Sequence, residues 1–122
     1  MSAAFGRVVI YTHKMAEMEA FYQRHFGFDV VRIEGDRIVE LVHPSTGLGI
    51  LLHPASTGQK EGQVLVKLVF DVEDVPAFVA RAKQGGLAFG KIFQADGYCF
   101  ANAKDPSKNS IQVSSRAFVS SK

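Results

Sequence analysis

Two kinds of hydrophobic pattern alternate along the chain. Short segments rich in β-branched and aromatic residues have the composition of strands, and in the first half they are 5–12, 28–34, 37–43 and 48–54. After the first of them, apolar residues recur at steps of three and four, which predicts an amphipathic helix that ends at Gly27. Turn residues separate the last three segments. The first half is therefore predicted to be strand, helix, strand, strand, strand.

The same order of elements recurs in the second half. Strands are predicted at 64–72, 88–94, 98–104 and 110–116, after which the tail is expected to be frayed. The helix of this half is predicted to begin with Asp74 as its N-cap and to stop at Gly85. The small, polar segment 55–63 is typical of a linker. We therefore expect one domain made of two βαβββ modules, residues 5–54 and 64–116, because neither can bury its sheet alone.

Composition and charge narrow the class of protein. Apolar residues make up 47% of the chain and charged residues 21%, as in ordinary globular proteins. The net charge of +2, without a run of Lys and Arg, argues against a nucleic-acid partner. No apolar stretch reaches the roughly 20 residues that span a bilayer, and the single cysteine, Cys99, has no partner for an internal disulfide. We expect a cytoplasmic protein with no membrane partner.

Three phrases carry a resemblance to a known superfamily. They are AFYQRHFGFDVV at 20–31, FDVEDVPAFVARAKQGG at 70–86 and DPSKNSIQV at 105–113. In this order, over a tandem βαβββ pattern, they resemble the vicinal oxygen chelate superfamily of glyoxalase I, bleomycin-resistance proteins and extradiol dioxygenases. The third phrase is similar to the family's closing pattern DP-x-G-N-x-I-E-L. The resemblance implies an α+β fold whose modules form a cup-shaped, eight-stranded mixed sheet, and it implies a homodimer.

The resemblance also identifies where a divalent metal would be held. Relatives that use a metal take one ligand from the first strand and one from the last strand of each module. The corresponding residues here are Arg7, Leu51, Lys67 and Gln112, with Leu51 placed to within one residue. Arginine and lysine offer only hydrogen-bond donors and leucine has no lone pair, whereas Ni, Zn, Mn or Fe need oxygen or imidazole ligands. We therefore expect no metal and no other cofactor, although a glutamate at position 112 would suit a metal cage.

The two cations at these positions have two interpretations. Residues two apart in a strand share a face, so Arg7 shares its side with Tyr11, and Lys67 shares its side with Asp71. The two cations would then form a site for a carboxylate or a phosphate. In the other interpretation they form internal ion pairs with Glu40, Asp71 or another acid, or lie at the wet rim of the sheet.

Other polar and aromatic residues are candidates for the same cup. His53 shares a strand face with Leu51 and is the first candidate for a general base, although ordinary edge histidines are more common than zinc ligands. Tyr11 and Tyr98 are candidates for an apolar wall, and Gln112 for a hydrogen bond to a ligand. The predicted ligand-binding residues are Arg7, Tyr11, Leu51, His53, Lys67, Tyr98 and Gln112.

The sequence thus predicts a glyoxalase- and bleomycin-resistance-like protein that binds a small polar or anionic molecule in a cup, without a divalent metal. The alternative is a lyase or isomerase of glyoxalase I type, metal-dependent or metal-independent, so it stays open whether the protein is an enzyme. A module that acts only through its protein surface has no positive support in the sequence.

Overall fold

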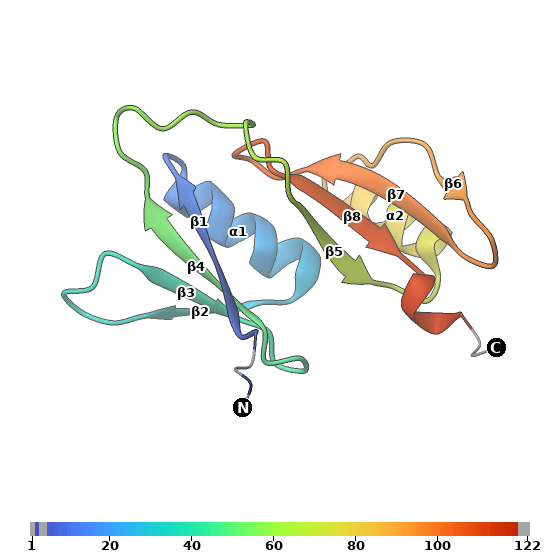
Figure 1. Cartoon of the computed structure of the whole chain (residues 1–122), viewed down its shortest axis with the longest axis horizontal. Coiled ribbons are helices and arrows are strands. Elements are labelled where there is room, and N and C mark those ends of the chain that lie inside the picture. Colours follow the sequence, from blue (N-terminus) through green and yellow to red (C-terminus); the bar gives the residue numbers. More distant parts are fainter. Residues whose placement is uncertain (1, 3–4, 120–122) are drawn as a thin grey trace. The chain divides into compact units, whose positions relative to one another are not determined.

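The computed structural model describes residue 2 and residues 5–119, and its elements follow the predicted order (Figure 1). Two compact units divide the chain, the first ending at Glu61 and the second beginning at Gly62, and each contains one βαβββ module. The elements are β1 (Arg7–Thr12), α1 (Met15–Phe26), β2 (Asp29–Arg32), β3 (Val39–Val42), β4 (Gly49–Pro54), β5 (Lys67–Asp71), α2 (Val75–Gln84), β6 (Phe93–Gln94), β7 (Cys99–Lys104), β8 (Ser110–Ser114) and the 3-10 turn η1 (Arg116–Phe118).

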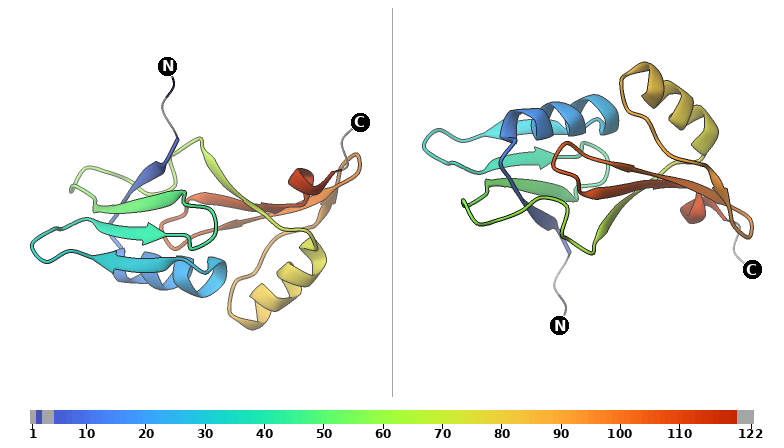
Figure 2. Two further views of the ribbon diagram at one scale, coloured as in Figure 1. Left: turned by 90° about the horizontal axis from the view of Figure 1, so that it is seen from below. Right: turned by 90° about the horizontal axis from the view of Figure 1, so that it is seen from above.

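The first module is a four-stranded mixed sheet with one helix on one face (Figure 2). Its strand order is β1-β4-β3-β2, in which β1 and β4 are parallel and the other pairs are antiparallel. Alternate side chains of the strands point to the helix, and those that are buried with it include Ile10, Leu41, Ile50, Leu52, Met18 and Tyr22. On the opposite face, Val9 and Tyr11 are 47% and 51% exposed. No helix of this module covers that face.

The second module repeats this arrangement with the strand order β5-β8-β7-β6. Here β5 and β8 are parallel, and the remaining pairs are antiparallel. Its core forms between the sheet and α2, from Val75, Ala82, Ala101, Ile111 and Val113. The two helices and the two four-stranded mixed sheets confirm the predicted tandem βαβββ fold of the α+β class. Within the described residues, neither helix has the length and the hydropathy that crossing a membrane would need.

The predicted helix ends are also found. Gly27 follows α1 with a φ of 74°, the left-handed conformation that glycine adopts without a Cβ clash. Asp74 precedes α2, and its side chain accepts a hydrogen bond of 3.0 Å from the backbone N–H of Ala77.

On the helix side of the first sheet, the buried carboxylate of Glu19 is ion-paired with Arg32. This ion pair stabilises a charge that burial would otherwise penalise.

Most strands begin or end one to three residues inside the predicted ranges, and two further differences have a physical reason. The strand predicted at 88–94 forms only at 93–94, because the segment before it closes α2: Leu87 is buried and its N–H donates to the Ala82 carbonyl at 2.8 Å. Gly90 then makes an isolated backbone bond to Asn102, and a glycine inside a strand weakens pairing. The prediction of a frayed tail is wrong for residues 117–119, which continue the turn η1; residues 120–122 lie outside the described part.

The turn between β7 and β8 is built around one buried carboxylate. Asp105 accepts hydrogen bonds from the backbone N–H groups of Ser107 and Asn109, both at 2.9 Å, and from the Asn109 side chain at 2.9 and 3.1 Å. Between them, Lys108 has a φ of 67°, the one positive value of a non-glycine residue in the described chain. The interpretation of this segment as turn chemistry is confirmed, and the turn fixes where β8 begins.

Candidate ligand-binding site

The face of the second sheet that α2 leaves uncovered, here called the open face, is a regular grid of side chains. The register pairs alternate residues of β5 with those of β8, and the same residues of β8 with those of β7. Three rows result, written in the order β5, β8, β7: Lys67–Ser110–Lys104, Val69–Gln112–Asn102 and Asp71–Ser114–Phe100. The grid is basic at one end and acidic and aromatic at the other.

A cavity of about 590 Å³ opens over the acidic and aromatic end of this grid. Its lining combines apolar, aromatic and polar side chains: Val69, Asp71, Tyr98, Phe100, Gln112, Ser114, Arg116 and Ala117. All of them belong to the second module. The volume lies within the range of roughly 300–1,000 Å³ that small-molecule sites occupy, and a mostly apolar lining with a few polar groups is characteristic of such sites.

A chain of hydrogen bonds orients Gln112 on the floor of the cavity. The ammonium group of Lys67 donates to Asn102 Oδ1 at 3.1 Å, and Gln112 Nε2 donates to the same oxygen at 2.9 Å. Because lysine has only donors, the oxygen of Asn102 must face Lys67, and Gln112 must then present its nitrogen to that oxygen. The carbonyl oxygen of Gln112 has no hydrogen-bond partner among the described residues.

The turn η1 closes one side of the cavity. The backbone N–H of Arg116 donates to Ser114 Oγ at 3.1 Å, which holds the turn over the end of β8. The Arg116 guanidinium donates to the Tyr98 hydroxyl at 2.9 Å, and its central carbon lies 5.3 Å from the centroid of that ring. On the other side Phe100 is stacked on Phe93, with 5.3 Å between ring centroids. The aromatic wall is therefore fixed by contacts within the module.

Asp71 is the acidic group of the cavity. Its side chain is exposed, and within residues 5–119 it makes no hydrogen bond or ion pair. It lies beside Ser114 in the third row and diagonally next to Gln112. The carboxylate is therefore available to a ligand.

The candidates of the first module lie together on its uncovered sheet face. Arg7 Nε donates to Glu40 Oε2 at 3.1 Å, with the two side chains 61% and 29% exposed. The ion-pair interpretation is thus confirmed for Arg7. The ring of Tyr11 packs against His53, whose centroid is 4.9 Å away, and Leu51 is paired in register between β1 and β3.

The hydrogen bond of His53 determines which ring nitrogen remains free. Nδ1 lies 2.8 Å from the Pro54 carbonyl oxygen, and since a carbonyl only accepts, Nδ1 carries the proton. The other nitrogen, Nε2, is then a hydrogen-bond acceptor in the neutral ring. This tautomer is compatible with the role of a base predicted for His53.

The seven predicted ligand-binding residues thus fall into two groups, one in each module. Tyr98 and Gln112 line the cavity, and Lys67 acts on it through Asn102. The strand alternation correctly placed Asp71 on the face of Lys67 but did not mark it as a site residue. Arg116 and Ala117 were missed because a short turn after the last strand leaves no periodic signal.

The four positions that the resemblance assigns to metal ligands do not fit a metal here. Arg7 is already a partner of Glu40, Lys67 donates to Asn102, and Leu51 supplies no lone pair. Over the described part of the chain, no group of three or more His, Cys, Asp or Glu side chains is placed to hold a metal ion. A divalent cation would therefore meet donors and an alkyl chain at three of the four positions.

The fold agrees with a match to a protein family. A model of the Glyoxalase/Bleomycin resistance protein/Dioxygenase superfamily matches residues 4–113. The chain belongs to this superfamily. The resemblance carried by the three sequence phrases is thereby confirmed.

Solved structures of the same fold share little sequence with this superfamily member. UcmS2 is 20% identical with a TM-score of 0.78, covering 94% of this chain and 99% of its own. TnmS3, an antibiotic binding protein from Streptomyces sp. CB03234, is 18% identical with a TM-score of 0.76, covering 92% and 94%. Lactoylglutathione lyase from Agrobacterium tumefaciens is 18% identical with a TM-score of 0.70, covering 93% of each chain. No curated protein matches the sequence. At such identities the likeness shows the fold alone.

Proposed function

We propose that this superfamily member binds a small polar molecule in the cavity of its second module, and that no divalent metal takes part. The observation that carries the proposal is the cavity of about 590 Å³, in which an aromatic wall faces Asp71, Gln112 and Ser114. Val69 and Phe100 offer apolar contact to a ring, and the polar groups offer hydrogen bonds that fix its orientation. One solved relative of this fold is an antibiotic binding protein, which supports a binding role.

The charge of the ligand is part of the proposal. An anion at Arg7 would compete with the carboxylate of Glu40, which is already ion-paired with it. Lys67 is engaged with Asn102. The geometry therefore favours a polar ligand over an anionic one in this cavity. Tyr11, Leu51 and His53 stay proposed ligand contacts of the first module's own sheet face.

The test first measures the metal content of untagged protein, purified without a chelator, by inductively coupled plasma mass spectrometry. The protein is then dialysed against EDTA and titrated calorimetrically with 2-naphthylmethanol, a neutral probe with one ring system and one hydroxyl. We expect far less than one metal ion per chain and saturable binding of the probe. About one tightly held metal per chain, or binding that needs added Zn²⁺, Ni²⁺ or Mn²⁺, would contradict metal-independent binding.

Two phenylalanine variants locate the binding. Phe100→Ala removes the aromatic wall of the cavity and is expected to weaken binding of 2-naphthylmethanol. The matched variant Phe5→Ala removes the same side chain at a position that is 77% exposed and does not line the cavity. It is expected to bind as the wild type does, and equal weakening by both changes would overturn the location.

The alternative is a metal-independent lyase or isomerase of glyoxalase type. The observation that favours it is the tautomer of His53, whose Nδ1 is held by Pro54 so that Nε2 can accept a proton; one solved relative is a lactoylglutathione lyase. Steady formation of lactoylglutathione by EDTA-treated protein, abolished in His53→Gln, would establish this alternative. Its absence at high protein concentration would leave the binding role.

The homodimer and the cytoplasmic location remain proposals based on the superfamily. The uncovered sheet face of the first module exposes Val9, Tyr11 and Val31, and apolar surface of this kind is often covered by a partner. Sedimentation velocity at several protein concentrations tests the dimer, and a single species with the mass of one chain would contradict it.

A further inference from the structure

We propose that the cavity of the second module selects a cationic hydrogen-bond donor, such as a protonated amine, which binds between the Asp71 carboxylate and the Gln112 carbonyl. This inference rests on the proposed function, because it names the class of ligand that the cavity would take. It also differs from the expectation of an anionic ligand, which followed from Arg7 and Lys67 when their partners were not known.

The first step is the orientation of Gln112. An isolated glutamine offers a ligand either a donor or an acceptor, because its amide can turn over. Here Lys67 determines the orientation of the Gln112 amide, because Lys67 donates to Asn102 Oδ1 and the same oxygen accepts from Gln112 Nε2. One N–H of Gln112 is thereby bound to Asn102, which fixes the orientation of the amide, and the carbonyl oxygen, an acceptor, stays on the side of the amide away from Asn102.

The second step is the placement of Asp71. Val69 and Asp71 are consecutive residues of β5 on the open face, and they are paired with Gln112 and Ser114 of β8. Asp71 and Gln112 are therefore diagonal neighbours on the same face, and both line the cavity. Two acceptors side by side, one of them charged, match a group with several N–H donors and a positive charge, and such charge-assisted hydrogen bonds are stronger than neutral ones.

The third step is the position of the Arg116 guanidinium, the positively charged side chain of the same cavity. Arg116 lines it as well, but its guanidinium donates to the Tyr98 hydroxyl and lies against that ring. Among the described residues Arg116 makes no ion pair with Asp71. Arg116 therefore leaves the carboxylate of Asp71 free to pair with a ligand.

Three probes with the same naphthyl ring test the inference: 2-naphthylmethylamine, 2-naphthylmethanol and 2-naphthylacetate. They present a cation, a neutral hydroxyl and an anion to the same cavity. We expect the amine to bind about tenfold more tightly than the alcohol, the difference between a charge-assisted and a neutral hydrogen bond, and the acetate to bind most weakly. Asp71→Asn keeps the shape of the side chain, and it should lower the affinity for the amine about tenfold while lowering the affinity for the alcohol far less.

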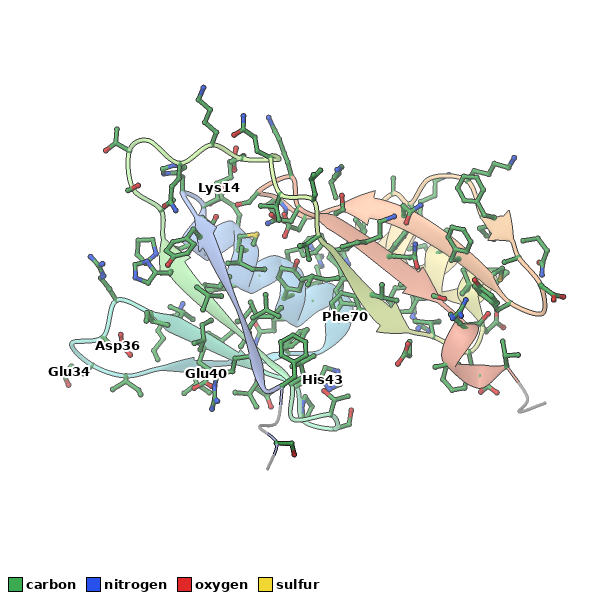
Figure 3. The ribbon with its side chains drawn as sticks, viewed as in Figure 1. Lys14, Glu34, Asp36, Glu40, His43 and Phe70 are labelled. Atoms are coloured by element: carbon green, nitrogen blue, oxygen red, sulfur yellow. The ribbon has the colours of Figure 1, made fainter. Side chains whose placement is uncertain are left out.

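Glu34→Gln is the matched control, because it removes one negative charge from an exposed residue in the turn between β2 and β3 of the first module (Figure 3). An equal loss of amine affinity in both variants would mean a general charge effect and would overturn the inference. A preference for the acetate, or an unchanged amine affinity in Asp71→Asn, would also overturn it while the proposed function stands, because the alcohol still binds. If no probe binds, the proposed function fails together with the inference.

Discussion

Lys108 provides a stability test of the turn that positions β8. Its φ of 67° lies in the left-handed region, where a Cβ approaches the following carbonyl oxygen. The superfamily's closing pattern has a glycine at this place, and glycine adopts the conformation without that clash. We therefore expect Lys108→Gly to stabilise the second module, although the substitution removes an exposed side chain and adds no contact.

The magnitude follows from two opposing effects. A non-glycine residue in the left-handed region costs roughly 1–2 kcal/mol, whereas glycine loses roughly 0.5–1 kcal/mol more backbone entropy on folding than alanine does. The lysine side chain is exposed and contributes little. The expected gain in the free energy of unfolding is therefore about 0.5–1 kcal/mol, or about 2–5 °C in Tm.

Urea unfolding followed by circular dichroism measures this gain. Lys108→Ala is the control, because it also removes the lysine side chain but keeps a Cβ in the strained conformation, and it should not stabilise. Lys108→Asn should fall between the two, since asparagine tolerates the left-handed region better than most residues. A glycine variant no more stable than the alanine variant would show that the left-handed conformation of Lys108 costs no stability.

Three further predictions concern the core, a histidine and the metal position. Leu52 is 0% exposed, so Leu52→Ala should lower the free energy of unfolding by about 2–5 kcal/mol in urea, and a loss below that range would contradict the packing of the first module. Partial burial, and secondarily the charge of Arg24, lower the pKa of His25 below its ordinary 6.5. The unfolded chain therefore binds this proton more readily than the folded protein does, so the contribution of His25 to stability is present above pH 6.5 and is lost as the pH falls below it. Urea midpoints measured across that range should vary less with pH in His25→Gln than in the wild type. Equal variation in the two proteins would contradict this prediction. Gln112→Glu should gain no stoichiometric Zn²⁺ in equilibrium dialysis, because Lys67 remains beside it; one zinc per chain would show that the metal positions were misassigned.

The local features of the fold could be predicted because they depend on neighbours in sequence. The end of α1 at Gly27 and the cap of α2 at Asp74 each follow from a few adjacent residues. Strand alternation likewise separated Arg7 and Lys67 from the helix-packed faces. Strand alternation did not predict the length of β6. Leu87, in the segment before this strand, is buried in the core and its N–H is bonded to Ala82, and tertiary packing determines this placement.

The site could be predicted only in part, because partner choice depends on residues far apart in the chain. Lys67 and Asn102 are 35 positions apart, yet their hydrogen bond determines which group Gln112 can offer to a ligand. The sequence does not indicate this hydrogen bond, and Lys67 was therefore predicted to bind an anion. Likewise, Arg116 and Tyr98 are 18 positions apart, and the hydrogen bond between their side chains places η1 beside the aromatic wall of the cavity, which no repeating pattern in the sequence indicates.

Binding of a small molecule over the second sheet, without a metal, can be mapped residue by residue. NMR chemical-shift changes are recorded in ¹³C,¹⁵N-labelled protein, in EDTA, during titration with 2-naphthylmethanol. We predict saturable changes at Val69, Phe100 and Ser114 and at the side-chain amide of Gln112, with none of comparable size at α2. Changes that appear elsewhere, or that appear at these residues only after a divalent metal is added, would contradict it.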